Sequence, residues 1–355
     1  MYTRDYFILE SSNNATYIIN SKNRESINFS LQFYKARNIK QKLMKSSLKL
    51  YLIFLKSFCN SLSLNILKSQ KEIEEYLNKI NQKNINFNLD KNSSILISPT
   101  RDKVIVHHHN RYFQKFAFGK SYKNVRNEAM IYKLFTKPLQ NFEISDIYEL
   151  NEIKNQYCSF KLSNKLVKDS KKVDLTLALI EFFNISKNQE LLFIVYIEEL
   201  KEKLEKLNLF NSNIHELINY IKTICSSKKI KLGLVHRDFK PWNIIIDNNN
   251  RLLIYDFEEA ITEGLPLEDL FNFYIDPIIR YKDMKYIEKI IYSEQNINQY
   301  QYYLKRLEIN TTFEPLLYTY LLERIIFWSE SNDLHTTQCY KELINYLFKR
   351  NKIEA

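Results

Sequence analysis

Short apolar runs separated by polar turns make the middle of the chain rich in predicted strands. Runs at Ile95–Ile97, Val104–Val106 and Tyr112–Phe118 predict three consecutive strands, because β-branched and aromatic residues bounded by turn sequences favour extended backbone. Residues 122–135 then change to helical spacing and predict one helix. Two further strands are expected after this helix, over residues 143–150 and 156–162.

Beyond residue 164 the pattern is mostly helical, with an interruption at residues 233–257. Within the interruption two apolar triplets, Ile244–Ile246 and Leu252–Ile254, flank a polar turn. This arrangement is typical of a β-hairpin. The chain therefore combines a strand-rich part with a larger helical part.

The first 90 residues have a different character. A short hairpin is expected around residues 11–14, and residues 38–81 favour helix because they contain neither Pro nor Gly. We therefore predict three parts: a mostly helical N-terminal extension at 1–90, a small lobe at 91–163 and a large lobe at 164–355.

Residues 38–60 form a basic amphipathic segment that has two interpretations. Packing of a helix on the body of the protein is preferred, and peripheral contact with an anionic membrane is the alternative. The segment is too short and too charged to span a bilayer. Its lysines are Lys40, Lys42, Lys45, Lys49 and Lys56.

Composition narrows the class of protein. The chain has 355 residues, of which 45% are apolar and 26% charged, so it can bury a sizeable core. Its 3 glycines are too far apart for the GxGxxG turn of a dinucleotide fold. Its 4 cysteines form no CxxC pair, which disfavours a zinc site and a disulfide framework.

The charge balance is basic, with 52 Lys and Arg against 41 Asp and Glu, or +11. Nucleic-acid binding is nevertheless disfavoured, because the charge is spread along the chain and no recognised nucleic-acid motif occurs. The charged opening, with Arg4, Asp5 and Glu10, does not have the pattern of a signal peptide. A cytoplasmic protein is expected.

The predicted hairpin carries the residues with the clearest chemistry. Asp238 and Asn243 lie in the loop that enters it, and Asp256 lies where its second strand ends. Because the hairpin folds the chain back, the three side chains can converge. Two carboxylates and an amide oxygen suit hard cations such as Mg²⁺ together with a general base.

These residues resemble the catalytic loop and metal-binding strand of the protein-kinase-like superfamily. The loop His236–Asn243, with the sequence HRDFKPWN, combines an HRD-x-K-P start with the Pro-Trp-Asn of the aminoglycoside phosphotransferase and choline kinase branch. Asp256-Phe257-Glu258 lacks the glycine of the protein-kinase DFG motif, and Gly264–Phe271 is similar to the segment that follows the metal Asp in the small-molecule branch. The resemblance therefore favours that branch, with a Ser/Thr protein kinase as the alternative.

The resemblance implies an α+β, two-lobed protein kinase-like fold and an enzyme that uses ATP or GTP with Mg²⁺. Asp238 would be the catalytic base and Lys240 would steady the γ-phosphate, while Asn243 and Asp256 would hold Mg²⁺. His236 is expected to brace the loop rather than to take part in catalysis.

The resemblance also assigns roles in the small lobe. Lys115, on the third predicted strand, would bind the nucleotide phosphates and pair with Glu128 of the next helix, with Lys120 as the competing lysine. Ser98 and Thr100 of a turn without glycine would replace the usual glycine-rich loop. Because that turn lacks glycine, a catalytically weak pseudokinase scaffold stays open.

The acceptor is not specified by these motifs. Its binding residues are expected within residues 267–349, a segment rich in Tyr. The predicted partner is a small molecule or glycan with a free hydroxyl: a sugar, an amino alcohol or a cell-envelope glycan precursor.

Overall fold

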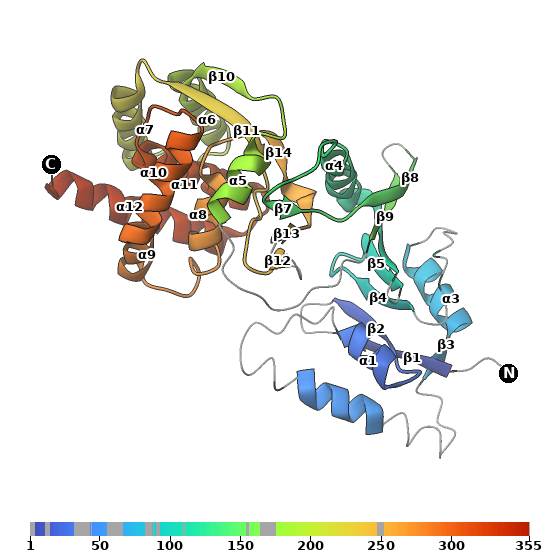
Figure 1. Cartoon of the computed structure of the whole chain (residues 1–355). Helices are drawn as coiled ribbons and strands as arrows, with labels where there is room; N and C mark the ends of the chain where they lie inside the picture. The colour runs from blue at the N-terminus through green and yellow to red at the C-terminus, as the bar shows by residue number, and fades with distance from the viewer. Residues whose placement is uncertain are drawn as a thin grey trace. The chain divides into compact units, whose positions relative to one another are not determined.

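The computed structural model describes residues 4–10, 15–31, 43, 45–54, 67–81, 87, 89, 93–108, 111–153, 156–163, 175–246 and 252–354. The chain divides into two compact units (Figure 1). The N-terminal unit consists of Met1–Lys133 and Ser145–Lys165, and the C-terminal unit of Leu134–Ile144 and Leu166–Ala355. The predicted α+β class is confirmed, because one unit is built on a large sheet and the other mainly on helices.

The N-terminal unit is built on one 8-stranded sheet with the order β3-β1-β2-β4-β5-β6-β9-β8. All its pairings are antiparallel, and the three consecutive strands predicted from the apolar runs are β4, β5 and β6. The strands are β1 (Arg4–Glu10), β2 (Thr16–Asn20), β3 (Lys68–Ser69), β4 (Ser93–Ile97), β5 (Lys103–His108), β6 (Tyr112–Phe118), β8 (Ile147–Ile153) and β9 (Tyr157–Ser163). The helices are α1 (Arg24–Ser30), α3 (Gln70–Asn81), the short η2 (Gly119–Ser121) and α4 (Tyr122–Tyr132).

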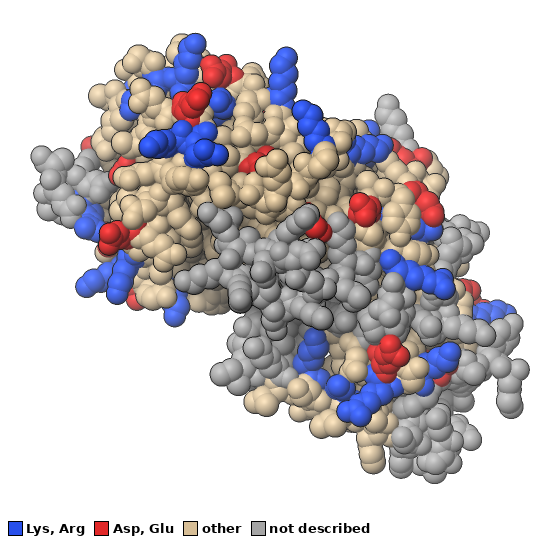
Figure 2. All heavy atoms as spheres, viewed as in Figure 1, with Lys and Arg blue, Asp and Glu red and all other residues tan. Residues whose placement is uncertain are grey.

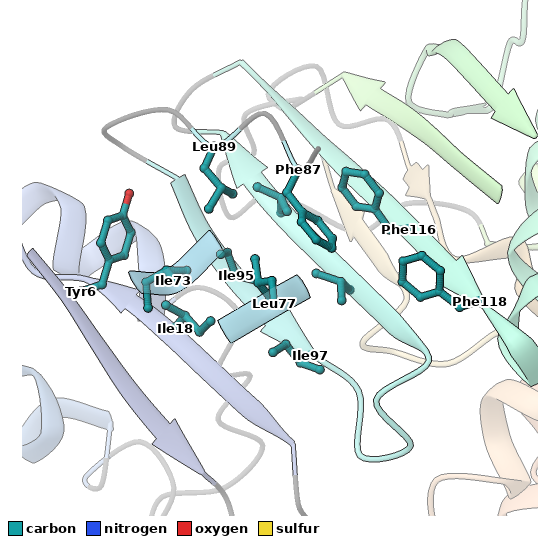
Figure 3. Close-up of a cluster of buried hydrophobic side chains, with 12 residues drawn as sticks. Tyr6, Ile18, Ile73, Leu77, Phe87, Leu89, Ile95, Ile97, Phe116 and Phe118 are labelled. Carbon is teal, nitrogen blue, oxygen red and sulfur yellow. The ribbon is translucent and has the colours of Figure 1, made fainter. Parts of the chain in front are cut away.

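The main core of this unit lies between the sheet and α3. Ile73 and Leu77, one turn apart on α3, are fully buried against apolar side chains of β4 and β5 (Figure 3). They lie four residues apart and therefore share one face of the helix, which explains why a helix that is otherwise charged docks here.

The predicted boundary at residue 90 differs from the structure. β1 and β2 form an antiparallel hairpin, as expected, but β2 continues the sheet by pairing Ile18 with Ile95 of β4. The first 90 residues therefore supply three strands of the same sheet in addition to helices, and they are not a separate extension. The turn expected at residues 11–14 lies outside the described residues.

The described part of the basic segment packs on this sheet. Residues 45–54 are helical, and Leu52 is buried among Ile19 and Ile27. The opposite side of this helix exposes Leu50 and Phe54, each 69% accessible. Lys40, Lys42 and Lys56 lie outside the described residues, so the membrane alternative stays a prediction. Within the part of the chain that the structure describes, no helix has the length and apolar character needed to span a bilayer.

The C-terminal unit is mainly helical. Its helices are α5 (Leu175–Phe183), α6 (Phe193–Lys206), α7 (Ser212–Cys225), the short η3 (Phe257–Glu259), α8 (Glu268–Ile275), α9 (Met284–Ile291), α10 (Glu294–Arg306), α11 (Phe313–Glu330) and α12 (Leu334–Glu354). α11 is apolar on nearly every side and forms the buried centre. On the face seen in Figure 2, basic and acidic side chains are interspersed over this unit.

Two small sheets accompany these helices. One has the order β10-β11-β14, with β10 (Gln189–Leu192), β11 (Lys229–Val235) and β14 (Ile261–Gly264). The other has the order β12-β13-β7, with β12 (Ile244–Ile246), β13 (Leu252–Ile254) and β7 (Phe142–Glu143). The pairing of Ile244 with Ile254 confirms the predicted hairpin.

Candidate active site

The loop that follows β11 is anchored by two glycines that face each other across the β11–β14 pair. Gly233 is paired with Gly264. A Cβ on Gly264 would lie 1.9 Å from a methyl carbon of Val235, and a Cβ on Gly233 would lie 2.5 Å from the carbonyl oxygen of Phe183. Both positions therefore require glycine for close backbone approach.

His236 braces the loop from within. Its ring is fully buried, with Nε2 3.0 Å from the carbonyl oxygen of Tyr255, and Nδ1 accepts from the backbone N–H of Asp238 at 3.3 Å. Burial lowers the pKa of His236, so the ring is neutral, with the proton on Nε2. These contacts match the bracing role expected for this residue.

Side chains from α8 and α11 hold the backbone of the next residue. Asp269 accepts from the backbone N–H groups of His236 at 2.8 Å and Arg237 at 3.0 Å. The carbonyl oxygen of Arg237 accepts from Asn272 at 3.0 Å and from Arg324 at 3.2 Å. Arg237 has a φ of 61°, a left-handed conformation that costs energy for a non-glycine residue, and these bonds hold it there.

Asp238 presents a carboxylate whose two oxygens are held separately. Asn243 donates from Nδ2 to Asp238 Oδ2 at 2.7 Å and to its carbonyl oxygen at 2.9 Å, while Lys240 Nζ lies 2.5 Å from Oδ1. Because the amide nitrogen of Asn243 points to Asp238, its oxygen is left to face another ligand. An amide oxygen in this position suits Mg²⁺, which binds oxygen ligands.

Lys240 is held on its other side by Asp276, at 2.6 Å. Asp276 is almost fully buried and also accepts from Arg324 at 3.0 Å and from the hydroxyl of Tyr340 at 2.6 Å. Burial acts to raise the pKa of Asp276, but Arg324 and Lys240 outweigh it and lower the pKa to about 2. Asp276 is therefore a fixed anion that positions the Lys240 ammonium beside the Asp238 carboxylate.

Asp256 ends the hairpin close to the same loop. The backbone N–H of Tyr255 donates to the carbonyl oxygen of Asn243 at 3.3 Å, which places Asp256 one residue away from this contact. The charges of Asp238 and Asp256 both act on the buried His236 ring, so the two carboxylates share one neighbourhood. Asp238, Asn243 and Asp256 thus belong to one neighbourhood of the C-terminal unit, and the binding of Mg²⁺ by Asn243 and Asp256 stays a prediction.

Lys115 and Glu128 form a buried ion pair in the N-terminal unit. Lys115 Nζ on β6 lies 2.7 Å from Glu128 Oε2 on α4, with side-chain exposures of 9% and 0%. The competing Lys120 lies in η2 and is exposed. The predicted pairing of strand lysine and helix glutamate is therefore present, and its role toward a nucleotide stays a prediction.

Ser98 and Thr100 are engaged within their own turn. Both hydroxyls donate to Asp102 Oδ1, with Ser98 at 3.3 Å, and the two hydroxyl oxygens lie 3.1 Å apart. Burial acts to raise the pKa of Asp102, but these bonds and one from Ser121 outweigh it and lower the pKa. The turn therefore presents an anion beside the two hydroxyls, and their predicted contact with phosphate stays untested.

Sequence reasoning missed the residues that hold the catalytic loop from a distance. Asn272, Asp276 and Arg324 lie 29 or more residues after Asn243 and belong to no local motif. One signal was present: Arg324 interrupts a strongly apolar stretch of α11. A charged residue in such a stretch is buried only when it has partners.

The comparisons with known proteins address the family. A family model described as "Phosphotransferase enzyme family" matches residues 199–306, which include the catalytic loop and the hairpin. The resemblance expected from the motifs is confirmed for this segment. No curated protein matches the chain.

Among solved structures, the ADP-bound aminoglycoside phosphotransferase APH(2'')-Ib is similar at 19% identity and a TM-score of 0.43, covering 78% of this chain and 97% of that one. A ternary complex of a thermostable mutant of aminoglycoside phosphotransferase APH(4)-Ia with AMP-PNP and hygromycin B is similar at 11% identity and a TM-score of 0.48, covering 78% of this chain and 97% of that one.

Proposed function

We propose that this chain is a phosphotransferase that uses Mg²⁺ and ATP or GTP to phosphorylate a hydroxyl group of a small molecule or glycan. The observation that carries the proposal is the arrangement of Asp238, held between Lys240 and Asn243, next to Asp256. The family match over residues 199–306 supports it.

In this proposal Asp238 accepts a hydrogen bond from the acceptor hydroxyl and takes its proton as the oxygen bonds to the γ-phosphorus. The bond between the γ-phosphorus and the bridging oxygen breaks, and the nucleoside diphosphate leaves. Because the two oxygens of Asp238 are fixed by different partners, the carboxylate needs little reorganisation at that moment. Lys240 balances negative charge on the transferred group. Asn243 and Asp256 would hold Mg²⁺, which neutralises charge on the phosphates.

Lys115 would bind the α- and β-phosphates. Its ammonium is buried, and Glu128 holds it in one orientation. Ser98 and Thr100 would contact the phosphates only after leaving Asp102.

A non-catalytic nucleotide-binding scaffold is the second candidate, and the Ser98–Asp102 turn favours it. The carboxylate of Asp102 is ionised and lies where phosphate oxygens would approach the two hydroxyls. The negative charge of Asp102 would repel the negatively charged phosphate groups and so weaken nucleotide binding. The scaffold and the enzyme would share one fold, and only the enzyme would turn over nucleotide.

The proposal is tested by thermal shift with ATP or GTP, with and without Mg²⁺. The wild type is expected to melt at a higher temperature only when nucleotide and Mg²⁺ are both present, because each stabilises the site that binds the other. Asp256→Asn should abolish the Mg²⁺-dependent part. Asp146→Asn, the same change at an exposed residue of the N-terminal unit, should keep it. A wild type that shows no shift with either nucleotide contradicts the proposal.

A further inference from the structure

The surroundings of Asp238 restrict the chemistry of the acceptor. Lys240 Nζ, 2.5 Å from Asp238 Oδ1, lies 5.7 Å from the ring centroid of Trp242 and 5.9 Å from that of Trp328. An acceptor whose hydroxyl reaches Asp238 must therefore place its neighbouring atoms close to an ammonium group and two indole rings. We call Lys240, Arg280, Arg324 and Trp328 the cationic wall.

Trp328 already receives three cations of the protein itself. Besides Lys240, the guanidinium carbons of Arg280 and Arg324 lie 5.1 Å and 5.2 Å from its ring centroid. An aromatic ring attracts a cationic ligand through the negative potential of its faces. Here three cations of the chain already use that attraction, so an ammonium group of a ligand would have to compete with them for the ring.

The carboxylates beside the wall are also engaged. Asp333 lies 2.5 Å from Arg280, and Asp276 is shared between Lys240 and Arg324. Among the described residues, Asp238, Asp276 and Asp333 each lie within about 3 Å of a cation of the wall. A cationic acceptor would have to compete with these internal pairs.

The wall does offer hydrogen-bond donors. The indole Nε1–H of Trp328 is buried and has no hydrogen-bond partner among the residues that the structure describes. A buried donor without a partner is costly, so a ligand that accepts from it gains binding energy. Arg280 is the most exposed cation of the wall, with 36% of its side chain accessible. Both groups recognise oxygen atoms that accept hydrogen bonds.

We propose that the acceptor is a hydroxyl compound rich in oxygen and without cationic groups, either a neutral sugar or its acid, which binds beside Trp328 and Arg280. This inference rests on the phosphotransferase function proposed above. It predicts discrimination against amino sugars and against polycationic aminoglycosides.

The test uses the full-length chain with saturating Mg²⁺-nucleotide and three sugars of one size: glucose, glucuronate and glucosamine. Kanamycin serves as a polycation. Phosphorylated product is measured by mass spectrometry and binding by saturation-transfer NMR. We define the response to a compound as the phosphorylated product formed and the saturation-transfer signal. We expect this response to be about tenfold lower for glucosamine and kanamycin than for glucose or glucuronate, because a single unfavourable charge contact near a protein surface has an effect of that order.

Variants of Arg280 distinguish an effect of the cationic wall on the choice of acceptor from a general change in activity. Arg280→Glu should raise the response to glucosamine relative to glucuronate by about tenfold, with Arg280→Gln in between. Arg306→Glu makes the same charge change at an exposed residue of α10 and should leave the ratio unchanged.

A wild type that prefers glucosamine or kanamycin, or that responds equally or not at all to the matched sugars, overturns the inference. So does an Arg280→Glu variant with an unchanged ratio. The Mg²⁺-dependent nucleotide shift is measured on the same samples. If that shift is present, only the acceptor inference has failed, and if it is absent, the proposed function itself has failed.

Discussion

The catalytic loop and the Ser98–Asp102 turn are both polar segments that follow a strand, but they are held in different ways. Buried side chains of α8 and α11, including Asp269 and Arg324, hold the loop. In the turn, most side-chain hydrogen bonds join residues at most five positions apart. The loop is therefore fixed by the packing of a whole unit, while the turn is fixed largely by its own sequence.

This difference matters for chemistry. Catalysis of phosphoryl transfer depends on positioning and electrostatics, which require groups that do not reorganise. Asp238 meets this requirement because its partner Lys240 is held by the buried Asp276 and its own backbone N–H is held by the buried His236. The turn, which is partly exposed, can change its hydrogen bonds at small cost. We therefore expect mutations that affect the loop to have larger effects than mutations in the turn.

The largest effect is expected from removing the distant brace. Arg324→Met should lower the free energy of unfolding by about 3–5 kcal/mol, because it leaves the buried Asp276 with only Lys240 and Tyr340 as partners. Denaturant unfolding checks this value. Adding Asp276→Leu to the variant should recover part of the loss, since the unpaired charge is then gone. If the losses in free energy of unfolding caused by the two substitutions simply add in the double variant, the pairing of Arg324 with Asp276 is contradicted.

A smaller loss of stability is expected from a substitution at Gly264, which pairs with the strand that leads into the loop. Gly264→Ala should destabilise the protein by about 2–3 kcal/mol, because its Cβ would overlap a methyl group of Val235 and push β14 away from β11. Gly119→Ala is the control, since a Cβ at Gly119 meets no atom within 4 Å, although its φ of 48° adds strain. Equal unfolding midpoints for the two variants would refute the close approach.

The pH dependence of stability tests the buried charges behind the loop. Burial raises the pKa of Glu323 to about 7, and the charge of Glu268 adds to this, while Arg237 opposes it. Between pH 4.5 and 7 the unfolded chain loses this proton and the folded chain keeps it, so stability falls as pH rises, by about 2 kcal/mol.

Glu323→Gln should remove this slope, because Gln has no proton to lose. Its Oε1 can still accept from the hydroxyl of Tyr196, the partner of Glu323. Unfolding measured at pH 5 and pH 7.5 provides the comparison. The same slope in both proteins would show that Glu323 is not the source.

The smallest effect on stability is expected at the turn. Ser98→Ala combined with Thr100→Val should change the free energy of unfolding by less than about 1 kcal/mol, since the lost hydrogen bonds are local and partly exposed. If the hydroxyls bind phosphate, the same variant should raise the KM for nucleotide and leave kcat nearly unchanged. A loss of stability as large as that of Arg324→Met would remove the contrast between turn and loop.

The parts of the fold that could be predicted from the sequence are those with a local pattern of apolar and polar residues. The strands at 95–97, 104–106 and 112–118 have apolar alternation, and the hairpin at 244–254 has a polar turn between two triplets, so both were found. A hairpin around residues 11–14 was expected, but the bounds of its first strand, Arg4–Glu10, were not, because the charged ends of this strand obscure the pattern. The pairing of β2 with β4, which makes this hairpin part of the large sheet, is not revealed by sequence alone.

The same reasoning applies to the candidate site. Asp238, Asn243 and Asp256 belong to a motif with fixed spacing, and the Lys115–Glu128 pair is supported by a strand followed by a helix. Asp276 and Arg324 depend on the packing of α8 against α11, which has no signature in local spacing. The residues proposed to bind the acceptor are hidden for the same reason, since Arg280 and Trp328 meet only in the folded unit.

The most direct test of the account is the turnover of Mg²⁺-ATP by the wild type and by Asp238→Asn, followed as release or transfer of the γ-phosphate. Nucleotide binding is measured by thermal shift in the same samples. The account predicts that the variant binds nucleotide like the wild type and turns over about 10³-fold more slowly, because only the group that meets the acceptor is lost. A variant that turns over at nearly the wild-type rate would contradict it, as would a wild type without turnover.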